Sequence, residues 1–410
     1  MKAPRGRSGC GKRKGCDQRS RLSGWSRRST PFGVIPSFPG AGPGSAVGAD
    51  HIVRMESFPG PSPSLLGLAC AVPPHAVTQE TIRDAARAVF GPRLRDFERL
   101  APVFENAGIA TRYASRPLDW FLTPRGWAEK NAAYLESALE LLERVALDCL
   151  ERAGLAPADV GAVVTVSSTG IATPSLDSVL MERLGMTPET VRLPVFGLGC
   201  AGGVLGLARA TDLARARPGV AVLLLVVELC SLTVRHGDIT ATNIVATALF
   251  GDGAAAVLVR CDSGDAGSEG ARIAASAEHT WPGTRSVMGW RIEDDGLGVV
   301  FSQDIPNLIR TRMRPVLDGF LGRHGLELAD LAGLVCHPGG VKVLDALAEV
   351  LAPVTDGLEH SRAVLRDYGN MSAVTVLFVL ERRMATGARG RHLMSAFGPG
   401  FTAAFLLLDL

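Results

Sequence analysis

The sequence predicts an α/β fold made of two related halves. From Leu65 onward, short apolar runs typical of buried strands alternate with longer amphipathic patterns typical of helices. In both halves a strand pattern gives way to a helix pattern through a turn rich in glycine and polar residues. Ligands of open α/β sheets bind at such strand ends, so we expect functional residues in these turns.

The elements of the first half follow one another closely. A helix rich in Ala, Leu and Glu is predicted over residues 129–153, and Gly154 supplies the usual C-terminal stop. A polar loop at 167–175 and the residues from Cys200 onward each begin a further helix. The buried strands are predicted at 160–166, in the apolar run before Cys200, at 220–227, and in a turn-and-strand segment at 249–259.

The second half repeats this rhythm after a join rich in Gly, Ser and Asp at residues 263–269. Its strands are predicted at 333–337 and 401–409. Its helices are predicted at 306–323, at 327–332, at about 341–351, and from Asn370 to about 386. We therefore predict an N-terminal half over residues 60–262 and a C-terminal half over residues 270–410.

Residues 1–54 are predicted to form a disordered basic extension. They carry eleven Lys and Arg against Asp17 and Asp50, a formal charge of +9 in a chain whose net charge is +2. The segment shows no apolar periodicity and cannot bury enough surface to offset its ordering entropy. Such a tail could contact nucleic acid or anionic lipid, or act as a transit peptide. We favour an upstream start, because Met55 opens the protein-like sequence.

The composition indicates a large core and no membrane span. Hydrophobic residues make up 47% of the chain and charged residues 20%, while the longest apolar runs cover about eight residues where a spanning helix needs roughly twenty. The eight cysteines form no even framework, and Cys10 and Cys16 have no histidine nearby, so we expect neither disulfides nor a zinc site. We predict a cytoplasmic protein with no nucleic-acid partner.

Cys200 is the candidate nucleophile. It lies where an apolar strand ends in a glycine-rich turn and a helix begins. Backbone N–H groups and the positive end of the helix dipole favour a thiolate at such a position. The flanking glycines leave room for a substrate carbonyl. The competing interpretation is a small buried cysteine in a close contact between helix and strand.

Two residues of the second half complete a candidate site with Cys200. His337 follows a buried strand and precedes a Pro-Gly-Gly turn, and as an imidazolium it would stabilise the thiolate. Asn370 follows Gly369 and could donate a neutral hydrogen bond to a developing oxyanion together with His337. Asn370 could equally be a simple helix N-cap.

These residues give the chain a family resemblance over nearly all of residues 60–410. It resembles the type III polyketide synthases, the chalcone and stilbene synthase family of the thiolase superfamily, in its bacterial form. Five motifs appear in the family's order, and any one alone would be weak. They are Gly-Leu-Gly-Cys200-Ala-Gly-Gly, Leu-Phe250-Gly-Asp-Gly-Ala, Cys-His337-Pro-Gly-Gly, Tyr-Gly-Asn370-Met-Ser, and Phe397-Gly398-Pro399-Gly400 with Ala396 in place of a glycine.

The resemblance implies a fold and a chemistry. The fold is a thiolase-like αβαβα layered fold in two halves, and a homodimer is implied. A starter acyl group passes from CoA to Cys200, and malonyl-CoA loses CO2 beside apolar Phe250 while His337 and Asn370 stabilise the enolate. The carbanion attacks the thioester, and the longer chain returns to Cys200. No metal or tightly held cofactor is required.

The resemblance also implies a substrate cavity, with departures from the plant enzymes. Val299 replaces a gatekeeping phenylalanine, which widens the passage, and Thr173 replaces a methionine that plant enzymes extend into the partner subunit. Cys230 lines the cavity without being a second nucleophile. Of the basic residues that bind CoA phosphates, Arg99 and Arg112 remain. The full set of implied cavity residues is Ser168, Thr169, Thr173, Cys230, Thr233, Val299, Phe397, Gly398, Pro399 and Gly400.

Several alternatives fit less well. A 3-oxoacyl-carrier-protein synthase III would show His-Gln-Ala-Asn where this chain has His337-Pro-Gly-Gly, and a degradative thiolase would need a second catalytic cysteine after Cys336. A papain-like protease would carry a different cysteine motif. Among products we favour long-chain alkylpyrones or alkylresorcinols, because small residues such as Ala172 and Thr173 suit an aliphatic starter. Malonyl-only tetrahydroxynaphthalene synthesis is the alternative, and no residue decides the mode of ring closure.

Overall fold

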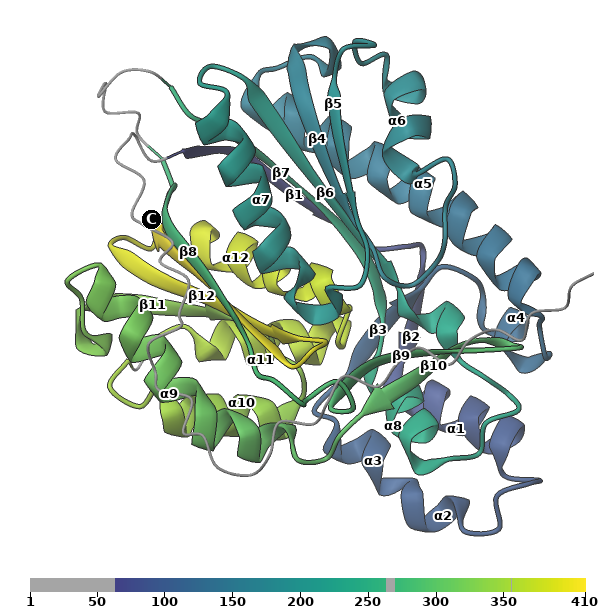
Figure 1. Cartoon of the computed structure of the whole chain (residues 1–410). Helices are drawn as coiled ribbons and strands as arrows, with labels where there is room; N and C mark the ends of the chain where they lie inside the picture. Colours follow the sequence, from purple (N-terminus) through teal and green to yellow (C-terminus); the bar gives the residue numbers. More distant parts are fainter. Residues whose placement is uncertain (1–62, 263–269, 355) are drawn as a thin grey trace, which may run out of the picture. The chain divides into compact units, whose positions relative to one another are not determined.

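The computed structural model describes residues 63–262, 270–354 and 356–410 (Figure 1). The predictions made for the basic extension at 1–54 and for the join at 263–269 lie outside these residues. In the part of the chain that is described, no helix has the length and apolar character needed to cross a bilayer.

Nine strands form one sheet in the order β11-β12-β13-β8-β1-β7-β6-β4-β5. In the set β4-β6-β7-β1 the first two strands are parallel and the next two pairs of neighbours are antiparallel. The set β11-β12-β13-β8 shows the same three pairings in the same order. The two sets meet where β1 pairs with β8. The bounds are β1 Ser64–Ala71, β4 Val160–Val166, β5 Val191–Val195, β6 Ala221–Leu229, β7 Asp252–Arg260, β8 Arg272–Thr280, β11 Gly333–Cys336, β12 Arg391–Gly398 and β13 Thr402–Asp409. The prediction of two related halves is confirmed.

Helices form three layers around the two halves of the sheet. Alternate residues of β6 show this, because Val222 and Leu224 join a core cluster with α7 and α12, whereas Leu223 and Leu225 join one with α5. A third cluster joins α9 and α10 to the other half of the sheet. The bounds are α5 Trp127–Ala153, α6 Leu176–Leu184, α7 Gly202–Ala216, α9 Ile305–Arg323, α10 Val341–Val350, α11 Leu358–Tyr368 and α12 Thr375–Ala385. The αβαβα layering is confirmed.

A smaller unit covers one end of the sheet, at the lower right of Figure 1. Its core joins Phe90, Phe97 and Phe104 to Ile244 and Ala248 of α8. Its elements are β2 His75–Thr78, α1 Gln79–Phe90, α2 Phe97–Leu100, α3 Pro102–Asn106, β3 Thr111–Ala114, α4 Leu118–Leu122, α8 Ala241–Leu249, β9 Met288–Glu293 and β10 Gly296–Phe301. This unit builds the walls of the cavity described below.

The predicted elements recur with few changes. The long predicted helix is α5, and Gly154 ends it with a φ of 66°. The helix predicted at 327–332 is wrong: only a single 3-10 turn forms at Leu328–Asp330, because Asp330 caps the backbone of Glu327 and the chain then enters β11. Asn370 does not follow a strand, since it lies between α11 and the 3-10 turn Ser372–Val374 that leads into α12.

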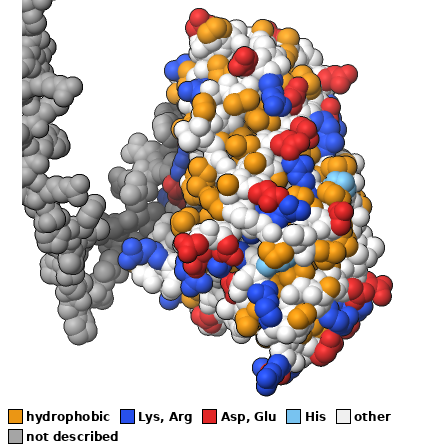
Figure 2. Space-filling model, turned by 90° about the vertical axis from the view of Figure 1, so that its right-hand side faces the viewer, with side chains coloured by type: hydrophobic (Ala, Val, Ile, Leu, Met, Phe, Trp, Pro, Cys, Tyr) orange, Lys and Arg blue, Asp and Glu red, His pale blue; other side chains and the backbone are white. Residues whose placement is uncertain are grey.

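The surface mixes charges of both signs. On the face shown in Figure 2, basic and acidic side chains are interspersed and no large area carries a single sign. Ion pairs join helices of the described chain, such as Arg87 with Glu98 at 2.8 Å and Arg183 with Glu143 at 3.5 Å.

We expect Gly203 to be essential for seating α7. A Cβ at Gly203 would lie 2.2 Å from the backbone oxygen of Ala373, so Gly203→Ala must push α7 away from the turn before α12. Overpacking of this kind should lower the free energy of unfolding by about 2 kcal/mol in urea. Gly322→Ala is the matched control, because nothing lies within 4 Å of its Cβ in α9 and the helix should gain up to about 1 kcal/mol. Equal effects of the two substitutions would contradict this packing.

Candidate active site

The turn that holds Cys200 is fixed by glycines and by a neighbouring loop. After β5 the chain passes through Gly197 and Gly199, which have φ values of 93° and 48°, and α7 begins only at Gly202. A Cβ at Gly199 would lie 2.7 Å from Pro399, and one at Gly398 would lie 2.5 Å from the oxygen of Leu198. The loop 397–400 therefore lies directly against the Cys200 turn, as a support for its backbone.

The Cys200 thiol is buried, and burial disfavours its charged form. Its Sγ donates a hydrogen bond of 3.6 Å to Oγ of Ser372, and burial raises its pKa to about 12. The sequence predicted a thiolate favoured by the start of a helix. In the structure a 3-10 turn over 199–201 separates the thiol from the first residue of α7, and burial acts against the charged form.

His337 is buried directly after β11. Its backbone N–H donates to the oxygen of Ser395 at 2.8 Å. Both ring nitrogens are buried without a hydrogen-bond partner among the described residues. Burial lowers the pKa of His337 to about 3, so the predicted imidazolium is not favoured here. A neutral ring has one free acceptor nitrogen and can take a proton from a thiol.

Asn370 joins the turns of the other candidate residues. Its backbone N–H donates to Leu249 at 3.0 Å, and its carbonyl accepts from Gly251 at 3.0 Å, so it pairs with Phe250 as an isolated bridge. Its Oδ1 accepts from the backbone N–H of Ser372 at 2.8 Å, and its Nδ2 donates at 3.3 Å to the oxygen of Gly339. The side chain is thus a cap of a 3-10 turn and also a link to the turn after His337.

Ser168 and Thr169 connect to a buried acid that the sequence analysis missed. The Glu228 carboxylate accepts hydrogen bonds from the backbone of Ser168 at 3.0 Å and from the hydroxyl of Thr169 at 2.8 Å. The Ser168 hydroxyl in turn accepts from the backbone of Gly199 at 3.3 Å, beside Cys200. Burial raises the pKa of Glu228 to about 8. Glu228 is the one acidic residue in the otherwise apolar strand β6, and this pattern could have indicated a buried acid.

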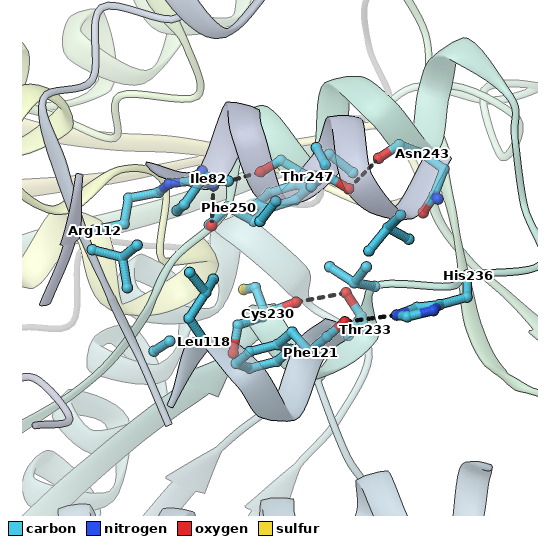
Figure 3. Close-up of a pocket in the computed structure, with 18 of the residues that line it drawn as sticks. Ile82, Arg112, Leu118, Phe121, Cys230, Thr233, His236, Asn243, Thr247 and Phe250 are labelled. Atoms are coloured by element: carbon cyan, nitrogen blue, oxygen red, sulfur yellow. Dashed lines mark hydrogen bonds between the residues drawn. The ribbon is translucent and has the colours of Figure 1, made fainter. Parts of the chain in front are cut away.

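An apolar cavity lies next to Phe250 (Figure 3). Cys230, Thr233 and Val299 line it, and Phe250 lies in its wall. Helix α1 contributes an apolar face that the sequence analysis did not identify, although its spacing could have revealed it. That face consists of Ile82, Ala85, Ala86 and Val89.

The remaining predicted cavity residues lie elsewhere. Thr173 is exposed, and Phe397 is buried in the core, where it stacks on Phe401 with 5.4 Å between ring centres. Cys230, which lines the cavity, has a buried thiol whose pKa is raised by burial. His236 lines the same cavity, but its Nε2 is bonded to the oxygen of Phe121 at 2.8 Å.

The two arginines predicted to bind CoA occupy different environments. Arg99 is exposed on α2. Arg112 is buried in the cavity wall, where burial lowers its pKa to about 9. Its Nη1 donates at 2.7 Å to the backbone oxygens of Thr247 and Phe250, so in this structure it is turned away from any phosphate at the surface. The described residues contain no cluster of acidic, His or Cys side chains suited to a metal ion.

Family models match most of the described chain. The model of the N-terminal domain of chalcone and stilbene synthases matches residues 126–263, and the model of their C-terminal domain matches residues 272–409. The two matches divide at the join that the sequence predicts between the halves.

Curated relatives cover the same part of the chain. A 1,3,6,8-tetrahydroxynaphthalene synthase of Streptomyces peucetius is 40% identical over 352 residues, 84% of this chain and 92% of that protein. A putative chalcone synthase of Bacillus subtilis is 35% identical over 84% of this chain and 98% of its own length. The alpha-pyrone synthesis polyketide synthase-like Pks18 of Mycobacterium tuberculosis is 28% identical over 88% of this chain and 96% of its own length.

Solved structures have the same fold. The 1,3,6,8-tetrahydroxynaphthalene synthase of Streptomyces coelicolor superposes with a TM-score of 0.79 at 29% identity, over 84% of this chain and 99% of that one. A polyketide synthase of the brown alga Ectocarpus siliculosus gives a TM-score of 0.79 at 27% identity, over 86% and 100%.

The buried Glu228 predicts a pH-dependent stability difference. Its raised pKa means that the folded protein favours the neutral carboxyl, so its contribution to stability is greatest below its ordinary pKa and is lost as pH rises through about 8. Glu228→Gln removes this loss. We expect the variant to gain roughly 3 kcal/mol in unfolding free energy relative to wild type between pH 5.5 and 8.5.

Urea unfolding at the two pH values measures this difference. Glu151→Gln is the control, because Glu151 is exposed on α5 and should give the same difference from wild type at both values. A Glu228→Gln difference that does not change with pH would contradict a buried, neutral carboxyl.

Proposed function

This chain belongs to the chalcone and stilbene synthase family of type III polyketide synthases, and we propose that it condenses an acyl-CoA starter held on Cys200 with several malonyl units, followed by cyclisation. As a type III polyketide synthase it is an acyltransferase, which sets aside the 3-oxoacyl-carrier-protein synthase alternative. The observation that carries the residue assignment is the network around Asn370, which links the turns of Phe250, His337 and Ser372.

The neutral state of the site defines how loading would proceed. With the pKa of Cys200 raised and that of His337 lowered, the thiol gives its proton to the imidazole as sulfur attacks the thioester carbonyl. The departing CoA sulfur then takes this proton from the imidazolium. The acyl group is left on Cys200, and His337 is neutral again for the next step.

Extension uses the same groups in a second role. The malonyl thioester loses CO2 and forms an enolate, whose oxygen is stabilised by an N–H of His337 and by Nδ2 of Asn370. The hydrogen bond from Nδ2 to Gly339 is long, at 3.3 Å, so this donor is available to a stronger acceptor. Phe250 offers no hydrogen bond to the carboxylate, which favours its loss as CO2. The enolate carbon attacks the Cys200 thioester and releases the Cys200 thiolate. The thiolate then attacks the CoA thioester of the longer chain, so that the chain returns to Cys200 and CoA leaves.

The cavity supports an aliphatic starter. It follows α8 from Phe250 past Thr247 and Ala246 to Asn243, a rise of about 10 Å along the helix. Figure 3 shows Phe250 and Arg112 at one side of it and His236 and Asn243 at the other. Apolar side chains form most of the wall, and Val299 leaves the passage open. We therefore propose long-chain alkylpyrone or alkylresorcinol products.

Malonyl-only synthesis of tetrahydroxynaphthalene is the second candidate. The 40% identity to a tetrahydroxynaphthalene synthase favours it. The two candidates differ in one observable, because the malonyl-only enzyme forms its product without any other acyl-CoA.

A homodimer, a cytoplasmic location and the lack of a resident cofactor stay predictions. Support for the dimer comes from β5, which is the edge strand of the sheet, and from two apolar side chains near it. Phe196 and Ile171 are 57% and 46% exposed.

Product formation tests the assignment of Cys200. The full chain is incubated with labelled malonyl-CoA, alone and with short, aromatic or long-chain acyl-CoA, and products are identified by mass spectrometry. We expect long-chain starters to give labelled polyketides, Cys200→Ala to abolish acyl loading, and Cys230→Ser to leave loading intact. A folded protein that forms no labelled product with any starter would overturn the proposed function. Loading that survives in Cys200→Ala but is lost in Cys230→Ser would overturn the assignment of Cys200.

A bulky side chain in α1 tests the path of the starter. Ala85 lines the cavity, so Ala85→Phe should fill part of it and lower kcat/KM for long-chain acyl-CoA by about 10-fold or more relative to short-chain acyl-CoA. Ala88→Phe is the matched control, because Ala88 is exposed on the same helix and does not line the cavity. An unchanged chain-length preference in Ala85→Phe would place the starter elsewhere.

A further inference from the structure

Arg112 is a buried charge that the chemistry above does not use. Its side chain is 3% exposed, and burial lowers its pKa to about 9. Nε and Nη2 have no hydrogen-bond partner among the described residues. Holding a guanidinium in such a place costs several kcal/mol unless its surroundings compensate, so its contacts indicate what it stabilises.

Those contacts lie at the C-terminal end of α8, where Phe250 follows the last helical residue. Nη1 of Arg112 donates at 2.7 Å to the oxygen of Thr247 and at 2.7 Å to the oxygen of Phe250. The other carbonyls of this last helical turn have their own donors, from Gln79 to Ala248 at 2.9 Å and from Asn370 to Leu249 at 3.0 Å. Arg112 therefore places a positive charge at the negative end of the helix and fixes the backbone of Phe250.

The stem of Arg112 fits between two glycines that flank the bridge from Phe250 to Asn370. A Cβ at Gly369 would lie 2.8 Å from Cγ and Cδ of Arg112, and one at Gly251 would lie 3.7 Å from its Cβ and Cγ. The stem thus touches the backbone on both sides of the bridge. Movement of this side chain would release both turns together.

A buried carboxylate two residues after Phe250 balances the charge. Asp252 is wholly buried, and it attracts the Arg112 guanidinium electrostatically. Its oxygens accept from the backbone of Ser115 at 2.8 Å and from the backbone and hydroxyl of Ser231 at 2.7 Å and 2.6 Å. The Phe250 turn is therefore held between a fixed cation and a fixed anion, and the anion also fixes the residue after Cys230.

We propose that Arg112 is a positioning residue that holds Phe250 in place for the decarboxylation of malonyl-CoA. It takes this role in place of the phosphate contact that the sequence suggested. The inference rests on the proposed function. It distinguishes the two half-reactions, since loading of Cys200 does not need Phe250 to be in place, whereas the loss of CO2 beside Phe250 does.

Arg112→Lys is the test variant. Lysine keeps a positive charge, but its Nζ ends one bond short of Nη1, the single nitrogen that makes both carbonyl contacts, so both contacts are weakened. Acylation of Cys200 by a long-chain acyl-CoA is followed by intact-protein mass, and decarboxylation of malonyl-CoA is followed by release of CO2. Rates are expressed per acylatable protein, so that unfolded protein does not count.

We expect acylation to stay within about two-fold of wild type, while decarboxylation falls by about 10-fold or more, the size of a lost charge-assisted hydrogen bond. Arg383→Lys is the matched control, because Arg383 is also buried but contacts His392 and Asp356, away from Phe250. It should not separate the two rates. In a Phe250→Ala background, Arg112→Lys should change decarboxylation by less than about 3-fold, because the residue that it positions is gone.

Three results would overturn the inference. Acylation and decarboxylation could fall together in Arg112→Lys, or the full effect could persist in the Phe250→Ala background. If Arg112→Lys yields no acylatable protein, Arg112→Met keeps the stem without the charge, and failure of both variants would assign Arg112 to folding alone. A wild-type protein that neither loads nor decarboxylates would refute the proposed function itself, which is a separate outcome.

Discussion

Two backbone hydrogen bonds, between Asn370 and the residues on either side of Phe250, hold the site together. They join a turn of the C-terminal half to a turn of the N-terminal half, and the Asn370 side chain extends the connection to the turn after His337 and to Ser372 beside Cys200. The layered fold serves this connection, because α7 and α12 lie between the two halves of the sheet and bring the turns at their starts together. The relative positions of these turns thus depend on the backbone and the side chain of Asn370 together.

Burial determines the protonation states in the site. Desolvation raises the pKa values of Cys200 and Glu228 and lowers those of His337 and Arg112, so each group is driven toward its neutral form. A neutral thiol can still attack a thioester, provided that its proton moves to the neutral imidazole as the carbon–sulfur bond forms. The same dry environment favours loss of a carboxylate as CO2 and strengthens hydrogen bonds to a developing enolate oxygen. One physical condition therefore serves both the loading and the extension steps.

The sequence was informative where local pattern and chemistry coincide. Helix α5 with its glycine stop, the strand β4 and the turns of Cys200 and His337 follow from periodicity and from turn residues. It was less informative where charge is buried, because a motif does not say which way a side chain points. The resemblance implies that Arg112 binds CoA, and the structure places it in the cavity wall, while no motif pointed to the buried Glu228. The protonation states of Cys200 and His337 depend on tertiary burial, which local sequence does not encode.

The central claim is that Cys200 carries the growing chain through repeated condensations. The most direct test is to quench the full-length protein during turnover with a long-chain acyl-CoA and malonyl-CoA, digest it, and measure the masses of its cysteine peptides. The account predicts that the Cys200 peptide carries the starter acyl group and longer forms extended by ketide units, while the Cys230 peptide stays unmodified. Acyl groups found only on another residue, or a Cys200 peptide that never carries more than the starter while product accumulates, would contradict it.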